Sequence, residues 1–195
     1  MRCSAVRSLM CLVALAVLFG ATAQEAAGAV LIDFETFPDG CRIPGGTRIT
    51  DQFAPLGVAT FATTDPAGPR IIQFGLTGQS GINALAGSPD FFQPITILFS
   101  APVVEASILA LDVGEAGLIL EGFNSQSILV DSMSVTHPGD GTGQFDTLAV
   151  VGDDIVQLVV RQITPGLGGD GYAIDDLRFS DNAPAGERRN RLNQR

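Results

Sequence analysis

The sequence contains few of the residues that mark disulfide-stapled scaffolds, aromatic binding platforms or nucleic-acid surfaces. Its 195 residues include no lysine and no tryptophan, one histidine and one tyrosine, and only three cysteines. The 11 arginines stand against 21 acidic residues, so the net charge is −10, which excludes a nucleic-acid binder because attraction to phosphate needs a basic surface. Zinc-type cysteine and histidine spacing, a phosphate-binding loop and a Gly-x-Ser-x-Gly elbow are also absent.

Apolar residues, in contrast, are abundant enough to form a large core. Hydrophobic residues make up 46% of the chain, which excludes a disordered polyanion. The length suits one domain, and 23 glycines and 11 prolines indicate many turns.

Residues 1–23 have the three parts of a cleavable export signal. Arg2 and Arg7 precede an apolar run from Leu9 to Phe19, and Ala21-Thr22-Ala23 supplies small residues for cleavage. The run is shorter than the roughly 20 residues that span a bilayer. The pattern therefore predicts an exported protein, periplasmic or extracellular, with no membrane span after cleavage.

Cleavage would remove Cys3 and Cys11 and leave Cys41 alone, so no internal disulfide is expected. Cys41 is then either an incidental thiol beside a turn or a site of pairing with a partner. The sequence predicts one domain over residues 24–181 and a frayed, basic tail over 182–195. Residues 25–181 hold 20 acidic residues against five arginines, a net charge of −15, so the acidity belongs to the folded body.

Short β-branched and aromatic runs, separated by Gly, Pro, Asp and Asn about every ten residues, are typical of an all-β fold. We expect a two-sheet antiparallel β-sandwich with ten strands: 30–37, 58–63, 70–75, 94–100, 103–111, 117–123, 127–135, 145–151, 155–162 and 172–180. Phe123-Asn124-Ser125-Gln126 is predicted to form a hairpin turn, because asparagine tolerates positive φ.

The last predicted strand carries two adjacent acids with different expected surroundings. Alternation of side chains places Asp175 on the face of Leu177 and Phe179, whereas Asp176 lies on the other face with Arg178 as a salt partner. A carboxylate on an apolar face is costly unless it is paired, hydrogen-bonded or bound to a metal. Asp175 is therefore the more informative of the two acids.

Phe34-Glu35 near the start and Gly171-Tyr172-Ala173-Ile174-Asp175-Asp176-Leu177 near the end resemble the ends of jelly-roll carbohydrate-binding-like modules. The same ending is similar to that of exported bacterial β-sandwich proteins with a PEP-CTERM tail, although no such anchor follows Ser180. The resemblance implies a jelly roll with a structural calcium ion where the first and last strands meet. It implies these ligands: Glu35 and Asp175, with Asp33 and Asp176 as additional ones.

We therefore expect a non-catalytic, calcium-stabilised module with a structural or adhesive role, its partner a polysaccharide or a surface protein. The alternative is a glycan-binding protein, although the chain lacks the tryptophan platforms of the glycan-binding members. A glycoside-active enzyme is a remote alternative, because His137 is the only histidine and is expected in a loop. The remaining prominent acids are expected to face solvent: Glu105, Asp112, Glu115 and Glu121.

Overall fold

A computed structural model describes residues 29–75, 79–87, 91–165, 167 and 171–180. The predicted export signal over 1–23 and the predicted tail over 182–195 lie outside the described residues. Among the described residues, none of the helices has the length and apolarity needed to cross a membrane.

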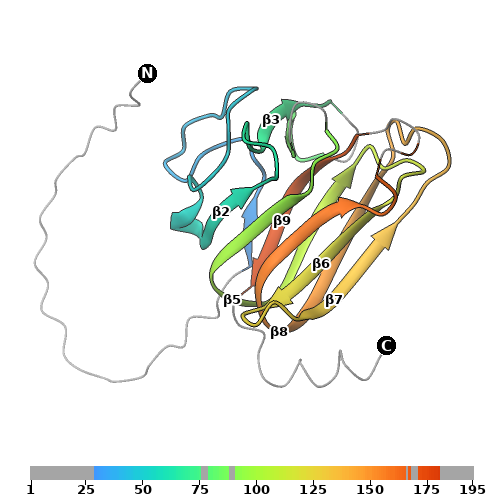
Figure 1. Ribbon diagram of the computed structural model, residues 1–195. Helices are drawn as coiled ribbons and strands as arrows, with labels where there is room; N and C mark the ends of the chain where they lie inside the picture. Colours follow the sequence, from blue (N-terminus) through green and yellow to red (C-terminus); the bar gives the residue numbers. More distant parts are fainter. Residues whose placement is uncertain (1–28, 76–78, 88–90, 166, 168–170, 181–195) are drawn as a thin grey trace, which may run out of the picture.

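The described chain is almost entirely β-structure (Figure 1). One short 3₁₀ helix, η1, covers Ala54–Leu56. The strands are β1 (Val30–Ile32), β2 (Val58–Ala62), β3 (Arg70–Gln73), β4 (Asn83–Ala86), β5 (Ile95–Leu111), β6 (Leu118–Asn124), β7 (Leu129–Val135), β8 (Phe145–Gln162) and β9 (Ala173–Ser180).

The strands form two antiparallel layers, as expected for a sandwich of jelly-roll type. The hydrogen-bonded order is β3-β4-β9-β5-β8-β6-β7, with β1 beside β9 and β2 beside β5. The start of β5 pairs with β2 and the end of β8, whereas the end of β5 pairs with β9 and the start of β8. One sheet is therefore β2-β5-β8-β6-β7, and the other contains β8, β5, β9, β1, β4 and β3.

The two longest strands each pass from one sheet to the other, which corrects the sequence prediction. The expected pairs 94–100 with 103–111 and 145–151 with 155–162 are single strands, β5 and β8. Their pairing shifts register between Leu98 and Val103, where the chain changes sheets. Pro102 and the polar residues at Gly152–Asp154 resemble turn signals, but here they mark bends within continuous strands.

Strand β4 was not expected from the sequence. Asn83-Ala84-Leu85-Ala86 contains no β-branched or aromatic residue, so its local propensity for a strand is low. All four residues are buried, and β4 pairs with β3 along its length. Burial between two neighbouring strands therefore decides its conformation.

The core lies between the sheets and is filled by the alternating apolar residues of the strands. Ile32 and Phe34 are both buried in it, as the alternation of the first strand predicts. Phe34 and Phe61 pack edge to face with ring centroids 5.8 Å apart, and Phe53 closes the cluster. Such aromatic pairs add about 0.5–1.5 kcal/mol each beyond the burial of their area.

A β-bulge in β9 corrects the predicted face of Asp175. Ser107 pairs with Arg178 and Leu109 with Asp175, so β9 has one residue more than β5 across this interval. Asp176 absorbs the extra residue with φ 46°. Ile174 and Leu177 therefore both enter the main core, and Asp175 lies on the outer face of the sheet.

Candidate functional site

A groove of about 400 Å³ crosses the outer face of the sheet that contains β8, β5 and β9. Strand β5 forms its floor because it lies between the other two strands. All three strands are hydrogen-bonded to their neighbours, so the groove has a rigid base. These residues line it: Ser107, Ile108, Leu109, Phe145, Asp146, Thr147, Asp176 and Arg178.

The wall from β9 carries the groove's charged pair. The Asp176 Oδ2 atom lies 3.5 Å from an Arg178 guanidinium nitrogen, as the sequence predicts for these two residues. The arginine side chain is 55% exposed, whereas that of Asp176 is 17% exposed. Its Oδ1 atom is buried without a hydrogen-bond partner among the described residues. The bulge thus turns a carboxylate toward the groove while Arg178 stays accessible to solvent.

The opposite wall, from β8, combines an exposed ring with a carboxylate. Phe145 is 43% exposed, which is unusual for the large apolar side chains of this chain. Asp146 follows it and forms an ion pair with the Nε2 atom of His137 at 2.5 Å. His137 lies in the loop after β7, as expected, but the sequence does not reveal this partner because nine residues separate the two.

Asp175 lies directly opposite Leu109 on the same face but is covered. It is 0% exposed and accepts hydrogen bonds from the backbone N–H of Asp176 at 2.8 Å and the Ser80 hydroxyl at 3.4 Å. Burial raises the pKa of Asp175 from 3.8 to about 7, since two hydrogen bonds do not replace the lost hydration. Within the described residues no arginine forms an ion pair with it.

The Glu35 carboxylate holds the segment that covers Asp175. Its Oε1 atom accepts the backbone N–H groups of Ile82 and Asn83, both at 2.7 Å. A Cβ atom on Gly81 would lie 2.2 Å from that oxygen, so glycine allows the close approach. Glu35 and Asp175, predicted as partners, therefore contact the same segment, residues 80–83.

Asp33 and the buried amides complete the surroundings of this segment. The Asp33 Oδ1 atom accepts the backbone N–H of Glu35 at 3.0 Å. Asn83 is fully buried and donates to the carbonyl oxygens of Phe34 and Ile43, both at 3.0 Å. The amide oxygens of Asn83 and Gln79 are buried without hydrogen-bond partners among the described residues.

These oxygens are the donor type that calcium prefers. The part of the chain that is described contains no group of three or more His, Cys, Asp and Glu side chains placed to hold a metal ion. The predicted carboxylates alone therefore do not form a cluster, and the unpartnered amide oxygens would have to supply further ligands.

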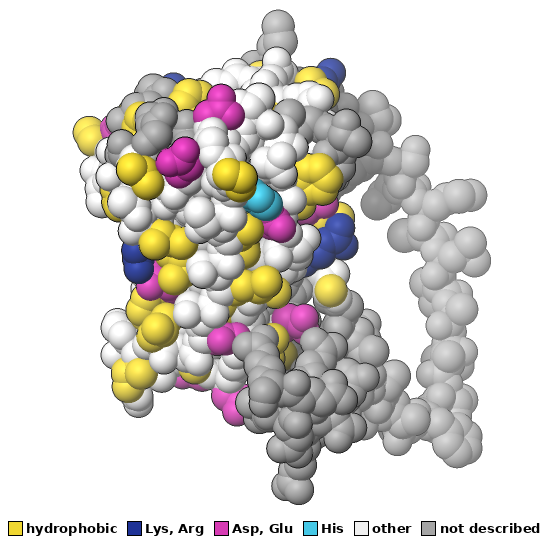
Figure 2. All heavy atoms as spheres, turned by 90° about the vertical axis from the view of Figure 1, so that its right-hand side faces the viewer, with side chains coloured by type: hydrophobic (Ala, Val, Ile, Leu, Met, Phe, Trp, Pro, Cys, Tyr) yellow, Lys and Arg dark blue, Asp and Glu magenta, His cyan; other side chains and the backbone are white. Residues whose placement is uncertain are grey.

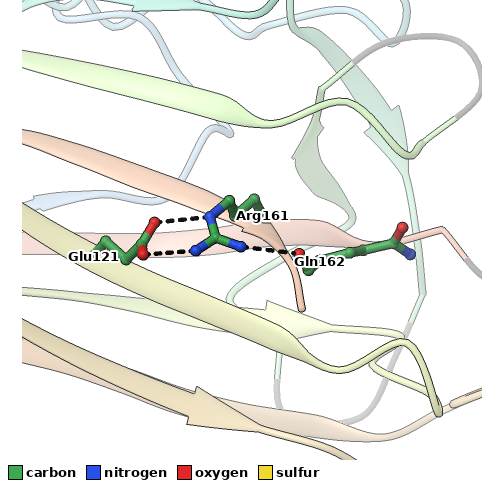
Figure 3. Close-up of polar contacts among 3 residues, drawn as sticks. All are labelled: Glu121, Arg161 and Gln162. Carbon is green, nitrogen blue, oxygen red and sulfur yellow. Dashed lines mark hydrogen bonds and ion pairs between the residues drawn. The ribbon is translucent and has the colours of Figure 1, made fainter. Parts of the chain in front are cut away.

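Across the other sheet, Glu121 of β6 and Arg161 of β8 form a bidentate pair (Figure 3). The two N···O distances are 2.8 and 2.7 Å, and the Glu121 side chain is only 13% exposed. The expectation that Glu121 faces solvent is wrong. The hydrogen bond from Arg161 satisfies the carboxylate at the surface of the sheet, and Glu121 raises the pKa of Arg161.

Sequence reasoning did not identify the groove. It named Asp176 and Arg178 as a pair but not Phe145, Thr147 and Ser107, which come from three separate strands. A signal was present in Phe145-Asp146-Thr147, where a large aromatic residue adjoins polar ones in a strand. Only the pairing of β8 with β5 and β9 brings these residues together.

Fold and site together define the class: an all-β antiparallel sandwich of jelly-roll type with a polar groove on one outer face. Scans against models of protein families and against curated protein sequences give no match. Solved structures, however, include similar β-sandwiches. The xylan-binding domain CBM22-2 of Xyn10C from Paenibacillus barcinonensis is 11% identical with a TM-score of 0.42, over 70% of this chain and 99% of that chain.

Two further similar structures have comparable scores. The carbohydrate-binding module CBM6cm-2 from Cellvibrio mixtus lichenase 5A is 9% identical with a TM-score of 0.38, over 72% of this chain and 100% of that chain. The K2 cleaved adhesin domain of Lys-gingipain is 13% identical with a TM-score of 0.46, over 78% of this chain and 99% of that chain.

Proposed function

We propose that this protein is a non-catalytic binding module that holds a neutral saccharide in the groove across β8, β5 and β9. The observation that carries the proposal is the composition of the groove. An exposed phenylalanine ring faces a mixed set of carboxylates, hydroxyls and one guanidinium on a rigid sheet. A structural or adhesive role, which we first predicted, does not require such a groove.

The groove offers both kinds of contact that a sugar ring needs. The apolar C–H face of a pyranose can pack on the ring of Phe145. The carboxylates of Asp146 and Asp176 accept hydrogen bonds from sugar hydroxyls, and the guanidinium of Arg178 donates them. Charged groups make the stronger hydrogen bonds, and their fixed positions provide specificity.

Charge favours a neutral sugar over an acidic one. The groove contains two carboxylates and one arginine, and residues 25–181 have a net charge of −15. A uronic acid or sulfated chain would meet the acceptor-only oxygens of Asp146 and Asp176, which repel anions. Sugar hydroxyls can donate to the same oxygens.

Calorimetric titration with soluble neutral polysaccharides tests this proposal. We expect saturable binding that Phe145→Ala and Arg178→Ala each weaken at least tenfold. Ile163→Ala is the matched control, since Ile163 has the same 43% exposure as Phe145 but does not line the groove. Absence of binding across a broad panel, or equal losses in the control, would overturn the proposal. Shortening of the bound polysaccharide would overturn its non-catalytic part.

We also propose that calcium stabilises the module at Glu35 and Asp175, with Asp33 and Asp176 nearby. Support comes from the buried, unpartnered amide oxygens of Asn83 and Gln79 beside the segment that Glu35 and Asp175 both contact. When bound, the ion would offset the charge of a buried carboxylate and link the segment to β9. The chain's own residues would hold it through hard oxygen atoms.

Thermal unfolding with calcium and with chelator tests this second proposal. A ligand that binds only the folded state raises stability by about 2.7 kcal/mol at 100 times its Kd. We expect a higher midpoint in calcium, and loss of that response in Glu35→Gln and Asp175→Asn. Asp140→Asn, a change of the same size at an exposed loop residue, should keep it. An unchanged wild-type midpoint would remove the proposed ion.

The proposed place of action is outside the cytoplasm, because residues 1–23 match a cleavable export signal. N-terminal sequencing of protein recovered from the exported fraction should begin at Gln24. Recovery of intact protein only from the cytoplasm would contradict this.

A further inference from the structure

Strand β7, Leu129–Val135, is an open edge of the sandwich. Among the described strands it pairs only with β6 and ends the hydrogen-bonded order of its sheet (Figure 1). Three of its apolar side chains are exposed: Leu129 by 49%, Met133 by 44% and Val130 by 38%. Its outer row of backbone N–H and C=O groups can therefore pair with another strand.

This edge lacks the features by which proteins normally block such pairing. It contains no proline, glycine or basic residue, and its one charged residue, Asp131, directs its carboxylate to the Val151 N–H at 2.9 Å. The other short edge strands differ. A bulge interrupts β2, which has five residues, and β3 has four residues, with Arg70 bridged to Arg48.

Charge also distinguishes β7 from the rest of the domain. The body has a net charge of −15 over residues 25–181, so two copies repel each other across most of their surfaces. Figure 2 shows the side of the molecule on which β7 lies, with hydrophobic and uncharged side chains over much of it. Repulsion between copies is therefore small where two β7 strands would meet.

We propose that β7 pairs antiparallel with β7 of a second copy and joins two domains into a two-fold dimer with a continuous sheet. In a symmetric antiparallel pair, directly opposite residues share a face, so the axis must pass beside one residue that faces its own copy. Full overlap of the seven residues places Ser132 there. It forms about six to eight new backbone hydrogen bonds along an edge of about 24 Å.

Side-chain pairing supports this register. With Ser132 at the axis, Asp131 lies opposite Met133 of the second copy, and Val130 lies opposite Ser134. A shift of the axis to Asp131 would oppose two carboxylates and shorten the overlap, which destabilises a sheet. This inference does not depend on the proposed saccharide site.

Analytical ultracentrifugation over a wide concentration range tests the dimer. The wild type should show a concentration-dependent monomer–dimer equilibrium. Ser132→Lys and Ser132→Asp should each raise the dimer dissociation constant at least tenfold, because each places like charges opposite each other at the axis. An equimolar mixture of the two variants should restore the dimer, since lysine then faces aspartate.

Two controls keep the outcome interpretable. Thr142→Lys adds the same charge at an exposed loop residue and should leave the dissociation constant unchanged. Circular dichroism should show that both Ser132 variants are folded, as expected for an exposed side chain. A wild type that stays monomeric at all concentrations would overturn the inference. So would a dimer that neither Ser132 variant weakens, or a mixture that fails to restore it.

Discussion

Replacement of Asp175 with asparagine isolates the cost of burying its carboxylate. The side chain is fully buried, and burial raises its pKa from 3.8 to about 7. Asparagine has the same shape and no charge. Its Oδ1 atom can accept the Asp176 N–H, and its Nδ2 group can donate to the Ser80 hydroxyl, which also acts as an acceptor.

The raised pKa determines the sign and the size of the effect. Below about pH 4 the carboxyl is protonated in both states, so the wild type has its full stability. Between the two pKa values the unfolded chain is ionised and the folded chain is not, and the free energy of unfolding falls by about 1.4 kcal/mol per pH unit. Above the folded value of about 7 the loss is complete, at roughly 4 kcal/mol.

Urea unfolding of both proteins from pH 4.5 to pH 8.5, with chelator present, measures this loss. The difference between wild type and Asp175→Asn should move by 2–4 kcal/mol in favour of the variant as the pH rises, on the order expected from burial. Other titrating groups cancel because both proteins carry them. Added calcium should restore wild-type stability at high pH but not that of the variant. Parallel pH profiles in chelator would refute the reasoning.

Three further substitutions test the packing of particular groups by urea unfolding. Gly81→Ala should cost about 1–3 kcal/mol, because its Cβ displaces Glu35 from two backbone N–H groups; a smaller loss would show that the segment yields. Tyr172→Phe should cost about 1–2 kcal/mol, since the buried hydroxyl lies 2.8 Å from two carbonyl oxygens; no loss would mean that water replaces it. Glu121→Gln should cost at most about 1 kcal/mol, because Arg161 is 40% exposed; a larger loss would contradict a surface pair.

The sequence predicts the fold class because strand formation here follows local pattern. β-branched runs and turn residues identify most of the strands, and the Asn124 turn forms as expected, with Asn124 Oδ1 accepting from Gln126 and Ile128. The paths of β5 and β8 between the sheets could not be predicted, because a bend within a strand and a turn between strands use the same residues. Strand β4 has no local signal and forms through burial.

The candidate site was predictable only in part. Asp175 and Glu35 could be singled out, because a carboxylate in an apolar pattern is costly wherever it lies. Their joint contact with residues 80–83 depends on the tertiary fold. The bulge at Asp176 inverts the alternation, so no pattern of period two could place Asp175 correctly. The groove depends on three strands that lie far apart in the sequence.

The most direct test of the central claim is to map a bound neutral oligosaccharide on the protein by NMR. Titration should shift the backbone amide signals of the groove residues, with the largest changes at Phe145, Thr147 and Arg178, and should leave those around Glu121 and Arg161 unchanged. Saturable shifts confined to the groove are the predicted result. Shifts centred on any other surface, or none with any neutral oligosaccharide of a broad panel, would contradict the account.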